Sequence, residues 1–188
     1  MRKIKNVYLS GLGAIGSSYA GRLYDMNPDS IKIIVDRERF ERYTRNGIEI
    51  NGKTYNFNYI LPEDDAAPAD LILIAVKQHH LEQAIKDIRN FVGKDTIIMS
   101  LLNGISSEEI LGQAFGMDKM LYSFCVGTDS VRNGTSIRYS VLGTIVFGEK
   151  TNTTYTEKVL AVKDLFDRAH IPYKIPEDMI REQWWKFM

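Results

Sequence analysis

The chain has 188 residues, of which 44% are hydrophobic and 26% charged, and its formal net charge is +0. This composition is typical of a globular protein with one large or two small domains. A net charge of zero provides no attraction for nucleic acid or an anionic membrane, so we expect neither as a partner. The single cysteine, Cys125, excludes an intrachain disulfide and a cysteine-rich metal site, and we expect a buried, inert thiol and no bound metal.

No apolar stretch approaches the length of a membrane helix. The basic N-terminus is followed by a strand and a glycine turn instead of the apolar core of a signal peptide. We therefore expect a cytoplasmic protein.

The first predicted strand, residues 4–9, leads into a glycine-rich turn and then a helix over residues 14–26. The turn has the pattern G-x-G-x-x-G, and this pattern indicates a dinucleotide site when a strand precedes it and a helix follows. Gly11 allows the reversal, Gly13 lets a pyrophosphate approach the backbone, and Gly16 allows close packing of helix on strand. The helix N-terminus also favours phosphate. The cofactor-binding residues predicted here are Gly11, Leu12, Gly13, Ala14, Ile15 and Gly16.

A second predicted strand, residues 31–35, ends in Asp36 and Arg37. An acidic residue at this place binds the ribose 2′-hydroxyl of NAD, whereas an arginine accommodates the 2′-phosphate of NADP. Arg37, with Arg39 nearby, can bind a phosphate through its guanidinium, and we favour NADP(H) over NAD. The alternative is that Arg37 pairs with Asp36 or Glu41 on a solvated face.

The next segments are a helix over residues 38–46 and a hairpin over residues 48–57 that turns at Asn51-Gly52. Apolar runs then predict buried strands that alternate with helices. The predicted strands are residues 71–76, 96–102, 120–126, 144–147 and 172–175. The predicted helices are residues 81–91, residues 106 to 112 or 116, residues 155–170, and a last one opened by Pro176. A second hairpin turns at Asn133-Gly134.

This alternation predicts an α/β fold with a Rossmann-like, doubly wound, mostly parallel sheet. Ligands of such sheets bind at the carboxyl ends of the strands. Besides the glycine turn and Asp36-Arg37, two strands end in polar residues, Lys77 and Asn103. These ends converge on one crevice. Lys77 could hold a ribose hydroxyl or a substrate carboxylate there, or it could be a solvent-facing loop lysine.

The last helix has an apolar stripe that we expect to face inward, with Lys186 on its flank. The stripe consists of Met179, Ile180, Gln183, Trp184 and Phe187. Trp185 points the opposite way, so either a partner chain in a homodimer covers it or further chain follows Met188.

The ordered set of motifs resembles the ketopantoate reductase (2-dehydropantoate 2-reductase) family over essentially the whole chain. The motifs are Gly11-Leu12-Gly13-Ala14-Ile15-Gly16, Asp36-Arg37, Val76-Lys77, Leu102-Asn103-Gly104, Arg132-Asn133-Gly134 and Trp184-Trp185-Lys186. The resemblance implies NADPH-dependent reduction of ketopantoate to pantoate in pantothenate and coenzyme A synthesis.

By this resemblance Arg37 binds the 2′-phosphate, Lys77 and Asn103 contact the nicotinamide and the substrate, and Ser130 lies near the cofactor, where the family often has alanine. Lys186 matches the proton-donating lysine. The resemblance also implies a cofactor domain over residues 1–175 and the start of an inter-domain helix over residues 176–188. We expect the helical C-terminal domain of the family to be absent from this chain, and therefore weak or no turnover from this chain alone.

Two other functions remain open. One is a dehydrogenase that uses NAD(P) and acts on a different 2-keto or hydroxy acid. The other is a non-catalytic domain that binds NADP(H).

Overall fold

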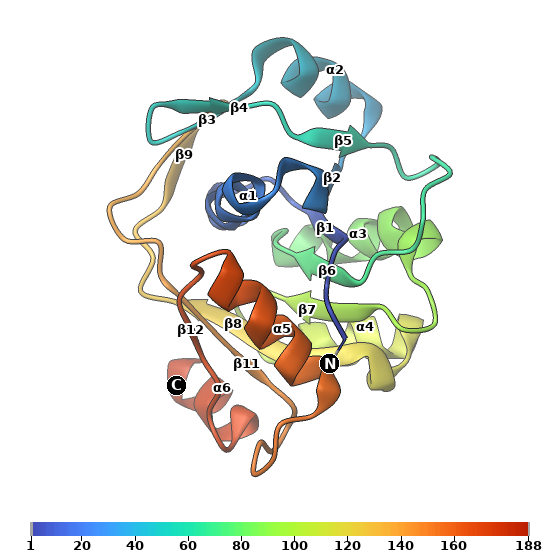
Figure 1. The fold of residues 1–188 in the computed structure, drawn as a ribbon, viewed down its shortest axis with the longest axis vertical. Helices are drawn as coiled ribbons and strands as arrows, with labels where there is room; N and C mark the ends of the chain where they lie inside the picture. Colours follow the sequence, from blue (N-terminus) through green and yellow to red (C-terminus); the bar gives the residue numbers. More distant parts are fainter. Residues whose placement is uncertain (1, 188) are drawn as a thin grey trace.

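An eight-stranded, mostly parallel sheet forms the centre of the computed structural model, which describes residues 2–187 (Figure 1). Across the sheet the order is β12 (Tyr173–Lys174), β11 (Thr144–Gly148), β8 (Met120–Val126), β7 (Ile97–Ser100), β6 (Leu71–Ile74), β1 (Val7–Ser10), β2 (Ile31–Ile34) and β5 (Asn58–Ile60). The strands from β8 to β5 are parallel, whereas β11 pairs antiparallel with β8 and parallel with β12. The predicted doubly wound fold is confirmed, and β5 is a strand that the sequence pattern did not reveal.

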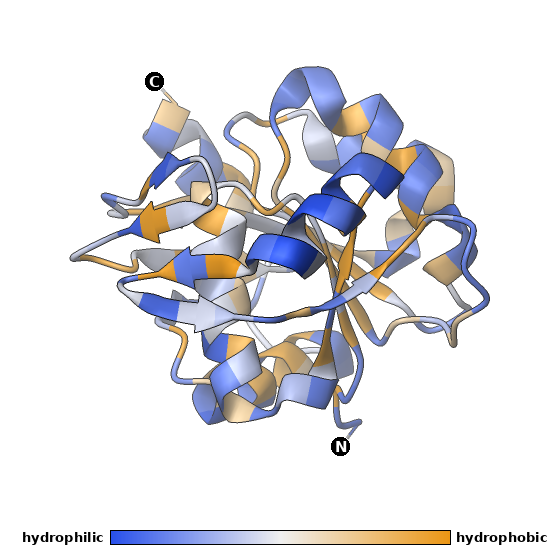
Figure 2. Ribbon diagram, turned by 90° about the horizontal axis from the view of Figure 1, so that it is seen from above, coloured by the Kyte–Doolittle hydropathy of each residue, from blue (hydrophilic) through white to orange (hydrophobic). Residues whose placement is uncertain are grey.

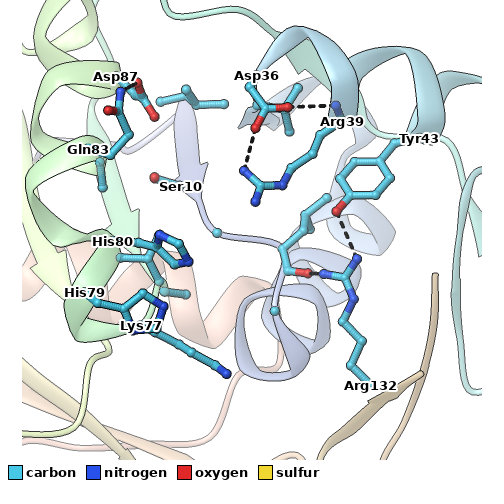
Figure 3. A pocket seen from close by; sticks show the side chains of 18 residues that line it. Ser10, Asp36, Arg39, Tyr43, Lys77, His79, His80, Gln83, Asp87 and Arg132 are labelled. Carbon is cyan, nitrogen blue, oxygen red and sulfur yellow. Dashed lines mark hydrogen bonds and ion pairs between the residues drawn. The ribbon is translucent and has the colours of Figure 1, made fainter. Parts of the chain in front are cut away.

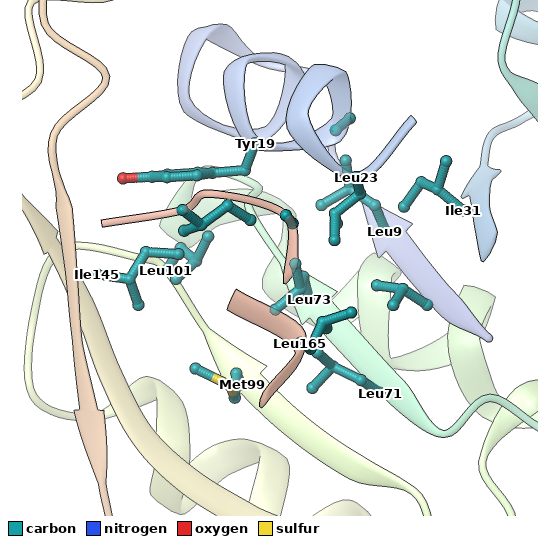
Figure 4. Packing of buried hydrophobic residues seen from close by; sticks show 14 of the residues in the cluster. Leu9, Tyr19, Leu23, Ile31, Leu71, Leu73, Met99, Leu101, Ile145 and Leu165 are labelled. Atoms are coloured by element: carbon teal, nitrogen blue, oxygen red, sulfur yellow. The ribbon is translucent and has the colours of Figure 1, made fainter. Parts of the chain in front are cut away.

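Helices cover both faces of this sheet. Figure 1 shows α5 (Glu157–Arg168) in front of the sheet, and α3 (Leu81–Ile88) and α4 (Ser107–Phe115) behind it. Leu71 and Leu73 pack in one apolar cluster with α1 (Ala14–Met26) and α5, whereas Ile72 and Ile74 pack in a second cluster with α3 and α4. Apolar side chains therefore leave the central strands on both faces, as a continuous apolar run predicts. Figure 2 shows the hydrophobic character of the central strands, and Figure 4 shows the cluster that contains Leu71 and Leu73.

The two predicted hairpins form and join into a second, four-stranded sheet. Its order is β4 (Lys53–Tyr55), β3 (Ile48–Ile50), β10 (Ser136–Arg138) and β9 (Val131–Asn133). The parallel pairing of β10 with β3 connects segments about ninety residues apart in the chain. The sheet packs on α1, where the Cδ1 of Ile50 would lie 3.2 Å from a Cβ built on Gly21. This second sheet brings β9 beside the glycine turn.

The helix after β2, α2 (Arg37–Asn46), begins one residue earlier than predicted because the Asp36 carboxylate caps it by accepting from the Arg39 N–H at 2.8 Å. Short 3-10 turns occupy residues 28–30, 78–80, 89–91 and 117–119. Within residues 2–187, no helix has both the length and the apolar character that a membrane span requires.

The last helix, α6 (Met179–Phe187), packs Met179 against Tyr122 and Phe124 of β8. Met179 and Gln183 are buried, one turn apart, and they define the inward face. The prediction that Trp184 faces inward is wrong, because its side chain lies a further 100° round the helix and is 48% exposed. Trp185 is 72% exposed, in agreement with its predicted direction.

Candidate functional site

A pocket opens where the carboxyl ends of β1, β2 and β6 meet (Figure 3). The chain runs from β1 to β2 on one side and returns to β6 on the other, so β1 is the point where the strand order reverses. Ligands of open α/β sheets bind at this place. The pocket is lined by Ser10, Gly11, Leu12, Gly13, Ile34, Val35, Asp36, Arg39, Tyr43, Ala75, Val76, Lys77, His79, His80, Gln83, Ala84, Asp87 and Arg132.

The three glycines of the turn have different surroundings. Gly11 has φ +106°, and a Cβ added there would lie 2.6 Å from the Ala75 carbonyl oxygen. A Cβ on Gly16 would lie 2.0 Å from the Gly11 carbonyl oxygen, so this glycine is needed for the close packing of α1 on the turn. A Cβ on Gly13 would meet only the Ala75 oxygen, at 3.8 Å, and would project into the pocket. The turn thus leaves a bare backbone at the start of α1, which fits a pyrophosphate.

The acidic residue after β2 faces the pocket together with an arginine. One Asp36 oxygen caps α2, and the other accepts from the Arg39 guanidinium at 2.7 Å, as Figure 3 shows. Arg37 instead forms an ion pair with Glu63 at 2.9 Å, and its side chain is 73% exposed. In this conformation Arg39, and not Arg37, is the arginine of α2 that lines the pocket.

A second arginine reaches the pocket from β9. The Arg132 guanidinium donates to the Leu12 carbonyl oxygen of the glycine turn and, at 2.9 Å, to the Tyr43 hydroxyl of α2 (Figure 3). Burial acts to raise the pKa of Tyr43, but hydrogen bonds and charge from Arg132 and Arg42 lower the pKa on balance. Arg132 therefore connects the turn, α2 and the second sheet, and adds positive charge to the pocket.

The strand β6 ends at Ile74, two residues earlier than predicted, and Lys77 follows it by three residues and lines the pocket. His79 and His80 line the α3 side of the pocket, and their ring centroids are 4.1 Å apart. Both are exposed. Among residues 2–187, no group of three or more His, Cys, Asp or Glu side chains has the arrangement of a metal site.

A lysine and an asparagine meet at the carboxyl ends of the neighbouring strands β7 and β8. The Lys186 Nζ on α6 donates to the Asn103 Oδ1 at 2.8 Å and to the Cys125 carbonyl oxygen at 2.7 Å. Asn103 follows β7 in the chain, and Cys125 lies near the end of β8. Parallel strands end at one edge of the sheet, so this pair lies at the same edge as the pocket.

The Lys186 ammonium lies among aromatic rings. It is 5.2 Å from the ring centroid of Phe124 and 4.6 Å from that of Phe187. Burial lowers the pKa of Lys186, and the opposing effect of the nearby Cys125 is smaller. A lysine with a lowered pKa can donate a proton more readily near neutral pH.

Ser130 contacts the first turn of α1. Its hydroxyl lies 2.9 Å from the Ser18 hydroxyl and donates to the Ala14 carbonyl oxygen at 3.0 Å. Cys125 is buried, as predicted, with its sulfur 2.9 Å from the Tyr19 hydroxyl. Burial raises the pKa of this thiol, in keeping with an unreactive cysteine.

The structure brings some of the predicted site residues into two groups, whereas Ala14, Ile15, Gly16, Arg37 and Ser130 are not among the described residues that line the pocket. Gly11, Leu12, Gly13 and Lys77 line the pocket, and Asn103 and Lys186 form a separate pair. Tyr43 and Arg132 are pocket residues for which no role was predicted. The spacing of Asp36, Arg39 and Tyr43 on one helix face could have indicated Tyr43, whereas Arg132 arrives through the pairing of two distant hairpins.

Comparison with known proteins identifies the family. The family model "Ketopantoate reductase PanE/ApbA" matches residues 7–152. The 2-dehydropantoate 2-reductase of Streptococcus pyogenes serotype M3 is 24% identical over 183 residues, which are 96% of this chain and 59% of that protein. The chain thus spans about three fifths of the length of this curated relative.

Solved structures agree in fold. The crystal structure of 2-dehydropantoate 2-reductase from Geobacter metallireducens GS-15 has a TM-score of 0.83 and 22% identity, and covers 96% of this chain and 61% of its own. D-mandelate dehydrogenase, in a ternary structure with NADH and anilino(oxo)acetate, has a TM-score of 0.83 and 21% identity. The match covers 96% of this chain and 60% of the dehydrogenase chain. The family model covers well over half of the chain, so the chain belongs to the ketopantoate reductase family.

Proposed function

We propose that this chain is the cofactor-binding part of an NADPH-dependent reductase that acts on a small 2-keto acid, with 2-dehydropantoate as the first substrate to test. Family membership and the pocket at the end of β1 support cofactor binding. The observation that carries the proposal is the Lys186 ammonium, hydrogen-bonded to Asn103 at the edge of the sheet where the pocket opens. A cation in this position suits the oxygen of a keto group that becomes an alkoxide.

In this proposal the backbone of residues 11–16 binds the pyrophosphate, and Ser130 lies near the cofactor. Arg39 binds the 2′-phosphate from within the pocket. Arg37 can join it, because its exposed ion pair with Glu63 contributes at most about 1 kcal/mol and is easily broken. Lys77 contacts a ribose hydroxyl or the substrate carboxylate.

A bound NADPH would supply the hydride that reduces the keto carbon. The Lys186 Nζ donates its proton to the keto oxygen, and the Asn103 Oδ1 orients the ammonium through their 2.8 Å hydrogen bond. Asn103 also lines the nicotinamide and substrate side. Residues 1–175 form the cofactor domain, and residues 176–188 begin an inter-domain helix. The remaining length of the relatives would then provide further substrate contacts.

A second candidate is an NADH-dependent dehydrogenase of another 2-keto acid. Asp36 favours it, because its carboxylate lines the pocket where an acidic residue binds the ribose 2′-hydroxyl of NAD. The similar D-mandelate dehydrogenase carries NADH and anilino(oxo)acetate in its structure. Titration of this chain with NADPH and NADH, followed by nicotinamide fluorescence, distinguishes the two cofactors.

The test of the reductase proposal is Lys186→Ala in a single-turnover assay of NADPH oxidation with 2-dehydropantoate at high protein concentration. We expect the rate to fall by about 100-fold or more, since a positioned acid contributes that much. The dissociation constant of NADPH should stay within about twofold of the wild-type value, which is only a small change in binding free energy. Lys86→Ala, on the exposed face of α3, is the matched control. An unchanged rate in Lys186→Ala, or no binding of either cofactor, would overturn the proposal.

A further inference from the structure

A buried carboxylate lies beneath the helix that carries Lys186. Glu108, in the first turn of α4, is 1% exposed, and Gln183 of α6 is 2% exposed. The Glu108 Oε1 accepts from the Gln183 Nε2 at 3.0 Å and from the Ser123 N–H at 3.3 Å, and the Oε2 accepts from the Ser107 hydroxyl at 2.9 Å. Burying a carboxylate is costly unless it is well hydrogen-bonded, so these three contacts determine whether the group can stay there.

The carboxylate fills a gap between two strands. The ladder between β7 and β8 last pairs Met99 with Leu121, and β7 ends at Ser100 while β8 continues to Val126. Beyond that point the N–H of Ser123 donates to Glu108, and its hydroxyl donates to the Ser100 carbonyl oxygen at 2.7 Å. The polar cluster thus replaces the strand pairing at the place where α6 crosses β8.

Two hydrogen bonds join residues 103–108 to residues 183–186 of α6, one at each end of these segments. Glu108 lies five residues after Asn103, and Lys186 lies three residues after Gln183, on the same side of α6. One hydrogen bond joins Glu108 to Gln183, and another joins Asn103 to Lys186 at 2.8 Å. A lysine side chain is long and flexible, so its ammonium is held in one place only if the helix beneath it is fixed.

We infer that Glu108 and Gln183 are positioning residues for Lys186. Their buried hydrogen bond fixes the rotation and depth of α6, and this holds the Lys186 ammonium against Asn103 and the Cys125 carbonyl oxygen. The consequence for catalysis rests on the proposed function, whereas the docking of α6 does not.

Three substitutions and a control test this inference. Glu108→Met and Gln183→Met keep the length of the side chain but remove the hydrogen bond between the two residues. Glu108→Gln keeps an Oε1 acceptor for the Gln183 amide and the Ser123 N–H, and should therefore preserve the docking. Glu109→Met is the matched control, because Glu109 is the next residue of α4 and is exposed.

The readout is the rate at which an amine-specific acylating reagent labels each lysine, measured by mass spectrometry. In Gln183→Met we expect the labelling of Lys186 to rise about tenfold, the effect of losing one buried hydrogen bond on a local opening. In Glu108→Met we expect at least the same rise, because this substitution also removes the acceptor for the Ser123 N–H and the Ser107 hydroxyl. Glu108→Gln and the control should stay within about twofold of the wild type, a factor too small for a lost hydrogen bond. Lys158, whose Nζ donates to the Met120 carbonyl oxygen at 3.1 Å, reports on β8 away from α6 and should not change.

Tryptophan fluorescence anisotropy is an independent readout, because both tryptophans of the chain, Trp184 and Trp185, are in α6. Release of α6 lowers the anisotropy in the two methionine variants only. Should Glu108→Met fail to fold, Gln183→Met carries the test by itself. The inference is overturned if Lys186 labelling and anisotropy in the methionine variants match the wild type. A parallel rise in Lys158 labelling also overturns it, because that rise indicates general loosening.

The single-turnover rate separates this inference from the proposed function. If Lys186 is the proton donor, Gln183→Met lowers the rate without a change in NADPH affinity, and Glu108→Gln retains the rate. If Lys186→Ala leaves the rate unchanged, the proposed function fails, while the labelling and anisotropy still decide whether Glu108 and Gln183 dock the helix.

Discussion

Two alanine substitutions in the glycine turn should separate cofactor binding from folding. Gly13 has φ −74°, a conformation open to any residue, and a Cβ there would have only the Ala75 oxygen within 4 Å, at 3.8 Å. A Cβ on Gly16 would lie 2.0 Å from the Gly11 oxygen, which is backbone and cannot rotate away. We therefore expect Gly13→Ala to impair binding alone and Gly16→Ala to impair folding.

The magnitudes follow from these distances. In Gly13→Ala, the loss of unfolded-state entropy stabilises the protein by about 0.4–1 kcal/mol, and alanine at a helix N-cap costs a similar amount. The midpoint of thermal unfolding should thus stay within about 3 °C. In Gly16→Ala the backbone must shift, at a cost of about 1–3 kcal/mol or more, which lowers the midpoint by roughly 3–10 °C.

Gly13→Ala, which should hardly change the thermal midpoint, should weaken the binding of NADPH. The added methyl of Gly13→Ala projects into the pocket where the pyrophosphate is proposed to lie, and we expect the NADPH dissociation constant to rise at least about tenfold, equivalent to about 1.4 kcal/mol. Circular dichroism melts and fluorescence titrations of the two variants measure both effects. The reasoning is refuted if Gly13→Ala binds NADPH as tightly as the wild type, or if it melts as early as Gly16→Ala.

Two further predictions concern charge. Arg39→Ala should weaken NADPH binding by about tenfold while leaving NADH binding within about twofold of the wild type, because only NADPH carries a 2′-phosphate. Fluorescence titration measures both affinities, with Arg37→Ala as the matched comparison, and equal losses for both cofactors would contradict the assignment. Burial raises the pKa of Glu108 above the ordinary carboxyl value of about 4.5, so the folded chain binds this proton up to a higher pH than the unfolded chain, and stability falls as the pH rises from that value through the folded-state pKa. Glu108→Gln lacks this titration, so its free energy of unfolding relative to the wild type should increase with pH over that interval and then level off. Urea unfolding between about pH 4 and 8 measures the difference, and parallel pH profiles of the two proteins would contradict the prediction.

Local signals were sufficient for most of the central sheet and its helices, and for the place of the pocket. The glycine turn, the start and end of α1, and the limits of β8 follow from short stretches of sequence, and the structure confirms them. Continuous apolar runs such as residues 71–76, of which residues 71–74 form β6, identified strands buried on both faces. The carboxyl ends of these strands then placed Lys77 at the pocket, because parallel topology brings them to one edge.

Non-local contacts and side-chain directions were not predictable in the same way. The pairing of β10 with β3, which delivers Arg132, joins two hairpins that each look complete by themselves. Arg37 and Arg39 are two residues apart, and only the position of Glu63, 26 residues further on, shows which of them turns outward. Glu108 follows the capping pattern of an exposed helix start, and nothing local indicates that Gln183 covers it.

The two groups of site residues therefore depend on different parts of the chain. Most of the pocket is built from residues 10–87, around the carboxyl ends of β1, β2 and β6, and none of its lining residues belongs to α6. The Asn103–Lys186 pair joins residues 83 positions apart, and α6 is attached through Met179 and the buried Gln183–Glu108 hydrogen bond. A disturbance of α6 should thus move the proposed proton donor while cofactor binding persists. Binding of NADPH by itself is therefore no evidence that Lys186 is in place, and the two must be measured separately.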